Sequence, residues 1–152
     1  MKYLNSVTLS IFAKPSEEDT AAIKKALIEL VPLNIEEEKI TVKEETAHGF
    51  NGQTIKIFTI VLTKQAHTTV FLKALVQRLS EEQKALLASQ KESRLDSELN
   101  FFIRLDKDKW LIDRTMFITD SGRCFHIKMH LAAYPARRAD ALVLVEKIFK
   151  PD

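Results

Sequence analysis

Two segments in the last third of the chain, residues 101–107 and 125–131, alternate large apolar side chains with polar or cationic ones. Successive side chains of an extended strand point to opposite faces, so each segment has an apolar face and a polar face. If both apolar faces pack on a core, the outer surface carries Phe102, Arg104, His126, Lys128 and His130, with Lys107, Lys109 and Arg114 near the strand ends. Such a surface suits RNA, because cations neutralise phosphates while aromatic rings and guanidinium planes stack on unpaired bases.

The same alternation has a simpler interpretation. Antiparallel sheets commonly have one polar face, and Asp106 could pair across strands with Arg104 or Lys128. Trp110 could likewise stack on a base, or fill the core or its rim. The pattern therefore predicts strands with one wet face and leaves open whether that face binds RNA.

Two arginines, Arg137 and Arg138, stand in the first turn of a predicted helix. Pro135 suits a first helical position, and apolar residues follow at helical spacing, namely Ala141, Leu144, Val145 and Ile148. Because a helix N-terminus is locally positive, arginines there are unfavourable unless an anion lies nearby. A phosphate would satisfy this, held by both side chains and by the free amides of the helix start. Alternatively, Asp140 pairs with one arginine and the stems of both arginines cover the edge of the core.

The histidines also bear on metal binding and catalysis. His126 and His130 lie two steps apart on one strand face, too far apart for an ordinary shared ion, and no third ligand is evident. With Lys128 between them, they could instead cleave RNA by general acid and base catalysis, the lysine stabilising the charge that develops on the phosphate. Neither Gly49 nor Gly52 is followed by the Lys-Ser/Thr pair of a phosphate-cradling loop. We expect a protein that is not an enzyme and that holds neither a metal nor a cofactor.

The composition is that of a globular domain. The chain has 152 residues, of which 45% are hydrophobic, enough for one domain with a real core. Its net charge is only +2, but residues 101–150 carry ten Lys and Arg against six Asp and Glu. The single cysteine, Cys124, excludes an intramolecular disulfide and fits a reducing cytosol. No apolar run is long enough to cross a bilayer, so we expect a cytoplasmic protein without membrane contact.

The remaining patterns predict an α+β domain. Alternation or apolar runs predict strands at 3–12, 39–47 and 53–63, the last two joined by a hairpin turn and the third central in the sheet. Helical spacing predicts helices at 16–31, near 72–79 and from a capping box at Ser80 and Gln83, followed by a loop or frayed helix end at 89–100. Three strands and the final helix complete the last third. Residues 1–152 are thus expected to form a single domain, a largely antiparallel sheet with helices packed on one face.

Two blocks of sequence carry a family resemblance. FFIRLDKDKW at 101–110 and FHIKMHLAAYPARRADALVLVEKI at 125–148, above all RLDK and AAYPARR at this spacing, resemble the archaeal RNA-binding family described as predicted exosome subunits. The resemblance implies a fold similar to the large-subunit ribosomal protein that holds 5S RNA, an RNA-binding role and no known catalytic residues. It assigns the basic signature positions to Arg104, Lys107, Lys128, Arg137 and Arg138. Where the family has a glycine after RLDK, this chain has DKWLIDR and so a different local loop.

Two functions are compatible with these patterns. The first is a non-catalytic RNA-binding protein, accessory to RNA processing or degradation, that contacts phosphates through the basic residues of the last third and stacks a base on Phe102. The alternative is a protein-interaction subunit of an RNA-processing complex such as the exosome, whose basic helix start docks on an acidic partner without direct RNA contact.

Overall fold

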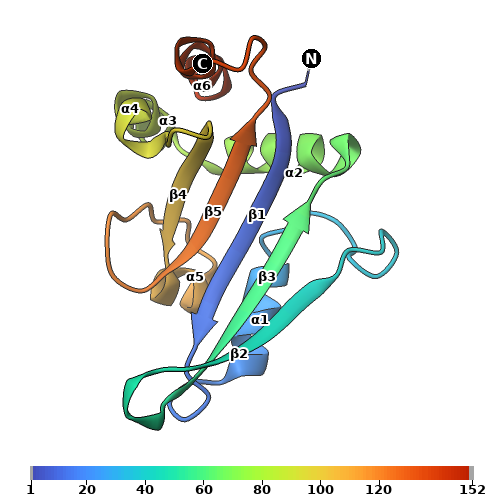
Figure 1. The fold of residues 1–152 in the computed structure, drawn as a ribbon, viewed down its shortest axis with the longest axis vertical. Coiled ribbons are helices and arrows are strands. Elements are labelled where there is room, and N and C mark those ends of the chain that lie inside the picture. The colour runs from blue at the N-terminus through green and yellow to red at the C-terminus, as the bar shows by residue number, and fades with distance from the viewer. Residues whose placement is uncertain (1, 151–152) are drawn as a thin grey trace. The chain divides into compact units, whose positions relative to one another are not determined.

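The computed structural model describes residues 2–150, with only the backbone described at Phe50. Five strands form one sheet in the order β2-β3-β1-β5-β4, and neighbouring strands are antiparallel (Figure 1). The strands are β1 (Leu4–Ala13), β2 (Val42–His48), β3 (Thr54–Leu62), β4 (Asn100–Asp106) and β5 (Cys124–Leu131). The helices are α1 (Thr20–Ile28), α2 (Gln65–Arg78), α3 (Glu81–Ser89), α4 (Lys91–Arg94), α5 (Lys107–Asp113) and α6 (Arg138–Ile148), with a 3-10 turn at Phe50–Gly52. The predicted α+β class with an antiparallel sheet is confirmed.

The strand faces are those that the alternation predicts. In β4 and β5 the buried side chains are Phe101, Ile103, Leu105, Phe125, Ile127, Met129 and Leu131. In β1 the buried set is Leu4, Val7, Leu9, Ile11 and Ala13. Apart from Asn100 and Cys124, which are also buried at the starts of β4 and β5, the intervening side chains of these strands are half-buried or exposed, so the sheet has one packed face and one open face.

The described residues divide into two compact units. The first unit comprises residues 2–7, 62–103 and 128–150, and the second comprises residues 8–61 and 104–127. In the second unit, α1 and α5 lie behind the strands in the view of Figure 1. Trp110 of α5 is buried, and its indole N–H donates to the carbonyl of Ala26 in α1 at 2.8 Å. The tryptophan therefore belongs to the core rather than to the open face.

Helix starts in the second unit differ from the prediction for reasons visible in the caps. Helix α1 begins after Asp19, whose carboxylate accepts from the Ala22 amide at 3.1 Å, so the predicted helix start at residue 16 is wrong. Asp106 ends β4 and caps α5, accepting from the Lys109 amide at 3.0 Å. Of the three strands predicted for the last third, the structure has two, β4 and β5, because residues 107–113 form α5 and the segment that follows only bridges β4, at Leu105 and Ile118.

The first unit contains the predicted capping box and the predicted apolar stripe. The Ser80 side chain accepts from the Gln83 amide at 3.1 Å, and Gln83 accepts from the Ser80 amide at 2.9 Å. The stripe Ala141, Leu144, Val145 and Ile148 of α6 is buried. Helix α6 begins at Arg138 with Arg137 as its N-cap, so Pro135 lies before the helix and the expected Pro135 start is wrong. The polar stretch at 89–100, predicted as a loop or frayed helix end, contains the single turn α4.

Candidate nucleic-acid interface

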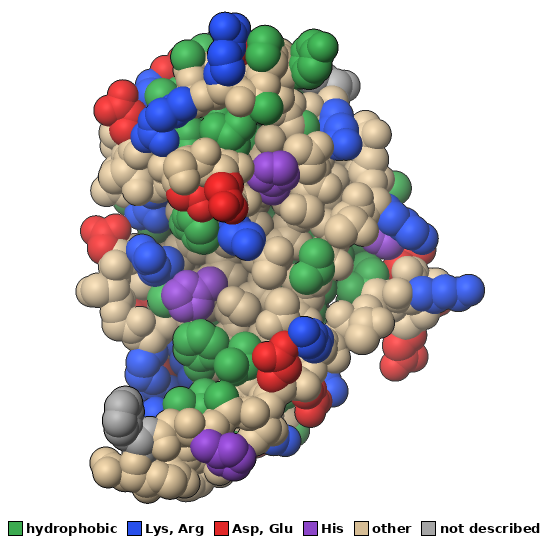
Figure 2. Space-filling view, viewed as in Figure 1, with side chains coloured by type: hydrophobic (Ala, Val, Ile, Leu, Met, Phe, Trp, Pro, Cys, Tyr) green, Lys and Arg blue, Asp and Glu red, His purple; other side chains and the backbone are tan. Residues whose placement is uncertain are grey.

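The open face has no single basic patch in the view of Figure 2. Lys and Arg side chains are interspersed there with Asp and Glu, and histidines lie beside apolar side chains (Figure 2). Within the described residues, no group of three His, Cys, Asp or Glu side chains is placed to hold a metal ion. None of the helices in residues 2–150 is both long enough and apolar enough to span a bilayer.

In the second unit, an exposed aromatic ring stands on the open face. Phe12 of β1 is 54% exposed, and its ring centroid lies 6.0 Å from that of His126 on β5, the two planes tilted by 49°. Arg104 of β4 is exposed and acts electrostatically on His126. We call Phe12, Arg104 and His126 the Phe12 platform. Phe12 is absent from the predicted site, although the alternation gives a signal, since it follows Thr8 and Ser10 at a polar-face position.

The electrostatics of the platform favour a neutral histidine. Burial lowers the pKa of His126 from its ordinary value, and the positive charge of Arg104 lowers it further. The Nε2 atom of His126 lies 3.6 Å from the sulfur of Cys124, whose own pKa is raised by burial. Around neutral pH the platform therefore presents two uncharged rings beside one guanidinium group.

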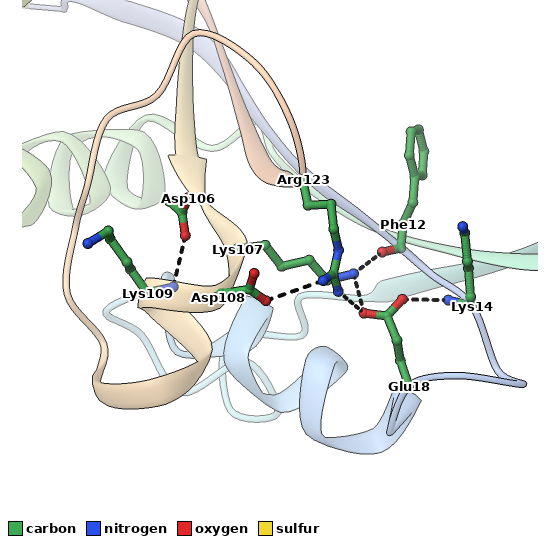
Figure 3. Close-up of polar contacts among 8 residues, drawn as sticks. All are labelled: Phe12, Lys14, Glu18, Asp106, Lys107, Asp108, Lys109 and Arg123. Atoms are coloured by element: carbon green, nitrogen blue, oxygen red, sulfur yellow. Dashed lines mark hydrogen bonds and ion pairs between the residues drawn. The ribbon is translucent and has the colours of Figure 1, made fainter.

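A buried ion pair fixes the end of β1 beneath the platform (Figure 3). The Lys107 side chain is only 4% exposed; its Nζ donates to the carbonyl of Phe12 at 2.8 Å and lies 2.7 Å from Glu18. Arg123 pairs with the same carboxylate at 2.5 Å, and the Lys14 amide donates to it at 2.9 Å. Lys107, a predicted RNA contact, is therefore turned inward and held by protein groups.

The same contacts set the charge of Glu18. Burial acts to raise the pKa of Glu18, but the hydrogen bonds from Lys107 and the Lys14 amide outweigh it, helped by the charges of Lys107 and Arg123. The net effect is a pKa below the ordinary value, so the carboxylate is ionised at neutral pH. Lys107 and Glu18 together form a buried pair of nearly balanced charge.

A cavity of about 530 Å³ opens beside this pair. Its lining includes the Phe12 and His126 rings of the platform. Ile55 of β3 adds an apolar wall, and the exposed residues Lys14 and Arg123 add cations. Aromatic, apolar and cationic groups thus converge on one hollow of the second unit.

The other predicted residues of the second unit lie around α5. Lys109 is exposed, with its ammonium 4.6 Å from the centroid of the Phe117 ring. Arg114 pairs with Glu29 and donates to the carbonyls of Trp110 and Leu111 at 2.8 and 2.9 Å. Arg114 therefore closes the C-terminal end of α5, whereas Lys109 faces solvent.

In the first unit, the predicted strand residues lie on the open face. Phe102 and Lys128 are half-buried. His130 is hydrogen-bonded to Asn5 of β1 at 3.3 Å, whereas His126 contacts Cys124 and Phe12, so the two histidines have separate surroundings. The pKa of Asp96 is lowered. Burial acts to raise it, but the hydrogen bonds from Asn100 and Glu98 lower it, and the positive charge of Lys128 lowers it further.

The two arginines at the start of α6 have protein partners. Arg137 pairs with Asp140 at 3.0 Å, the pairing that the alternative interpretation of the sequence expects for one of the two arginines. Arg138 donates to the carbonyls of Leu95 and Glu92 at 3.1 and 2.7 Å. The partners expected near these arginines are thus protein groups: the Asp140 carboxylate for Arg137, and the backbone carbonyl oxygens of Glu92 and Leu95 for Arg138.

Comparisons with known proteins place this geometry in a family. A DUF54 family protein from Archaeoglobus fulgidus superposes with a TM-score of 0.82 at 25% identity, over 95% of this chain and 99% of that one. An uncharacterized protein of Methanocaldococcus jannaschii is 28% identical over 107 residues, 70% of each chain. An RNA-binding protein of Pyrococcus abyssi is 23% identical over 121 residues, 80% of this chain and 78% of that one. A family model described as RNA binding matches residues 6–131, and the chain therefore belongs to this RNA-binding family.

Proposed function

We propose that this protein binds RNA without cleaving it and that the Phe12 platform is a principal contact. The observation that carries the proposal is the 54% exposed Phe12 ring beside His126 on the open face of a sheet. Its contact with His126 leaves more than half of this large apolar residue in water, and stacking on a base would bury that surface. Membership of the RNA-binding family and the similarity to the Pyrococcus abyssi RNA-binding protein support the same function.

The platform combines the two interactions that single-stranded RNA requires. Base stacking on an aromatic side chain contributes roughly 1–3 kcal/mol per base, and cations beside it neutralise the backbone. Arg104 supplies a cation within the platform, and the exposed Lys14, Lys109 and Arg123 supply others in the same unit. In the first unit, we propose Phe102, Lys128, His130 and Arg137 as further contacts. Lys107, Arg114 and Arg138 are assigned to the protein's own contacts instead.

Fluorescence anisotropy with labelled single-stranded and hairpin RNAs at two salt concentrations tests the proposal. We expect salt-dependent binding by the wild type and a loss of about tenfold in affinity for Phe12→Ala. Ile112→Ala is the matched control, because Ile112 is 80% exposed in the same unit but lies on α5, away from the platform. Equal losses for both variants, or no binding by the wild type, would contradict the proposal. RNA cleaved during incubation with pure protein would contradict its non-catalytic part.

A second candidate function is a protein-interaction subunit of an RNA-processing complex, the exosome included. The first unit favours it with an apolar cavity of about 300 Å³ whose lining includes Leu72 and Val76 of α2 and two lysines, Lys73 and Lys147. A partner retained after nuclease treatment and lost with Lys73→Glu/Lys147→Glu would favour this function. An accessory role in RNA processing and a cytoplasmic location remain proposals, supported by the family resemblance and by the single buried thiol of Cys124.

A further inference from the structure

We infer that the cavity beside the Phe12 platform receives one unpaired nucleotide, so that the protein selects RNA with an unstacked base. The inference rests on the proposed function and specifies the kind of RNA. The cavity volume of about 530 Å³ lies in the range of small-ligand sites, roughly 300–1,000 Å³. Phe12, Ile55 and His126 give it apolar and aromatic walls on which the flat face of a base can pack.

The charges of the cavity separate a neutral part from a cationic part. Glu18 and Lys107, both in the lining, are paired at 2.7 Å and largely buried, so their charges nearly cancel. The lining also holds Lys14, Glu17 and Arg123, all exposed, and Arg123 pairs with Glu18 and Asp108. Three cations against two carboxylates leave the rim with one net positive charge, and the exposed Lys14 can reach an anion outside. This division matches a nucleotide, whose base is uncharged and whose phosphate is anionic.

The chemistry also sets which hydrogen bonds a base can make there. The lowered pKa of Glu18 keeps its carboxylate ionised, and an ionised carboxylate only accepts hydrogen bonds. Amino and imino N–H groups on the edge of a base are donors of the required kind. In a duplex these edges are paired and the base faces are stacked, so only an unpaired nucleotide can offer both to the cavity.

A set of three RNA hairpins tests the inference. All three share the same loop; the stem of the first is fully paired, the stem of the second carries one bulged nucleotide, and the stem of the third carries an abasic residue at the bulge. We expect the wild type to bind the bulged hairpin about tenfold more tightly than either of the others. Ile55→Trp, which narrows the cavity, should remove this preference and keep the affinity for the paired hairpin. Ile57→Trp is the matched control, because Ile57 lies on the same strand and face but outside the cavity lining.

The outcomes separate the inference from the proposed function. Wild-type protein that binds all three hairpins equally would overturn the nucleotide pocket and leave RNA binding intact, whereas no binding to any hairpin would overturn RNA binding itself. A free nucleoside 5′-monophosphate that binds as tightly as the bulged hairpin would overturn the inference in favour of a small-molecule site. Circular dichroism checks that Ile55→Trp is folded; if it is not, the wild-type comparison of bulged and abasic hairpins decides.

Discussion

Lys107 and Lys109 stand two positions apart in the same basic block but have opposite surroundings. Lys107 is buried and paired with Glu18, whereas Lys109 is exposed over the Phe117 ring. The alternation predicts which face a strand residue occupies, but both lysines follow the end of β4, where the period of two no longer holds. Burial of Lys107 depends on Glu18, 89 positions earlier, and one sequence does not reveal that pairing.

The first prediction concerns the buried pair. Glu18→Gln should lower the free energy of unfolding by about 3 kcal/mol at neutral pH, because it leaves the Lys107 ammonium buried without a counter-charge. The pKa of Glu18 is lower in the folded protein, so its stabilising effect is present above the unfolded-state pKa and is lost as the pH falls through the folded-state pKa. The difference between variant and wild type should therefore shrink in acid.

Urea unfolding followed from about pH 7 to about pH 3 measures this difference. Glu17→Gln is the control, because Glu17 is the exposed neighbour on the same turn and should change stability by less than about 0.5 kcal/mol. A Glu18→Gln effect of the same size at every pH would show that charge pairing with Lys107 is not the source of the stability.

The second prediction concerns His126. Its lowered pKa leaves the ring neutral at neutral pH, and protonation in mild acid would add a positive charge at the platform. RNA affinity should therefore rise as the pH falls through the folded-state pKa of His126, at a pH below the ordinary histidine range. His126→Gln should lose this part of the pH dependence in anisotropy titrations. His48→Gln, on the exposed edge strand β2, should retain it; the same profile for both variants would rule out His126 as the titrating group.

At the scale of elements, periodicity located the strands well and caps decided the helix boundaries. The apolar faces of β1, β4 and β5 are the predicted ones, because a strand with one packed face must alternate. A helix start depends on a single side chain that accepts a backbone N–H. Asp19 and Asp106 each stand among several polar residues, so the sequence pattern did not single them out as caps. The Asp106 cap likewise turns the chain into α5 directly after β4, and the next segment, predicted as a strand, makes only the bridge between Leu105 and Ile118.

The third prediction separates the two arginines of α6. Arg138→Ala should cost about 1 kcal/mol of stability, because its guanidinium holds the carbonyls of Leu95 and Glu92 in another element. Arg137→Ala should cost less than about 0.5 kcal/mol, because its pair with Asp140 is exposed to solvent. Thermal or urea unfolding of the two variants measures both values. A larger loss for Arg137→Ala would contradict this division of roles.

At the scale of the whole molecule, net charge is a poor guide to the interface. The last third carries the basic excess, but Lys107, Arg114 and Arg138 are committed to protein contacts. Phe12, at the centre of the proposed interface, comes from the first strand instead. Composition and periodicity therefore predicted the fold class and the faces of the sheet, whereas the site depends on pairings between segments distant in sequence.

The fourth prediction follows from counting the cations of the second unit that are free to face RNA. With Lys14, Arg104 and Lys109 each meeting a phosphate, the logarithm of affinity for single-stranded RNA should fall with the logarithm of salt concentration at a slope of about −2. Arg104→Gln should reduce the steepness by about 0.7. Titrations across a salt series measure the slope. A slope near zero would mean that binding does not depend on backbone contacts.

The covered edge of β4 limits how any partner can approach. On its outer side, the Asp106 amide donates to the Phe117 carbonyl at 2.8 Å, and the Thr119 amide donates to the Arg104 carbonyl at 2.9 Å. Towards the start of the strand, Arg94 donates to the Phe102 carbonyl at 3.2 Å. These backbone groups are thus unavailable to an incoming peptide, so strand addition and edge-to-edge aggregation are blocked along β4. The other edge of the sheet is β2, a short strand that carries the charged residues Lys43, Glu44 and Glu45, and such charges disfavour pairing with another strand.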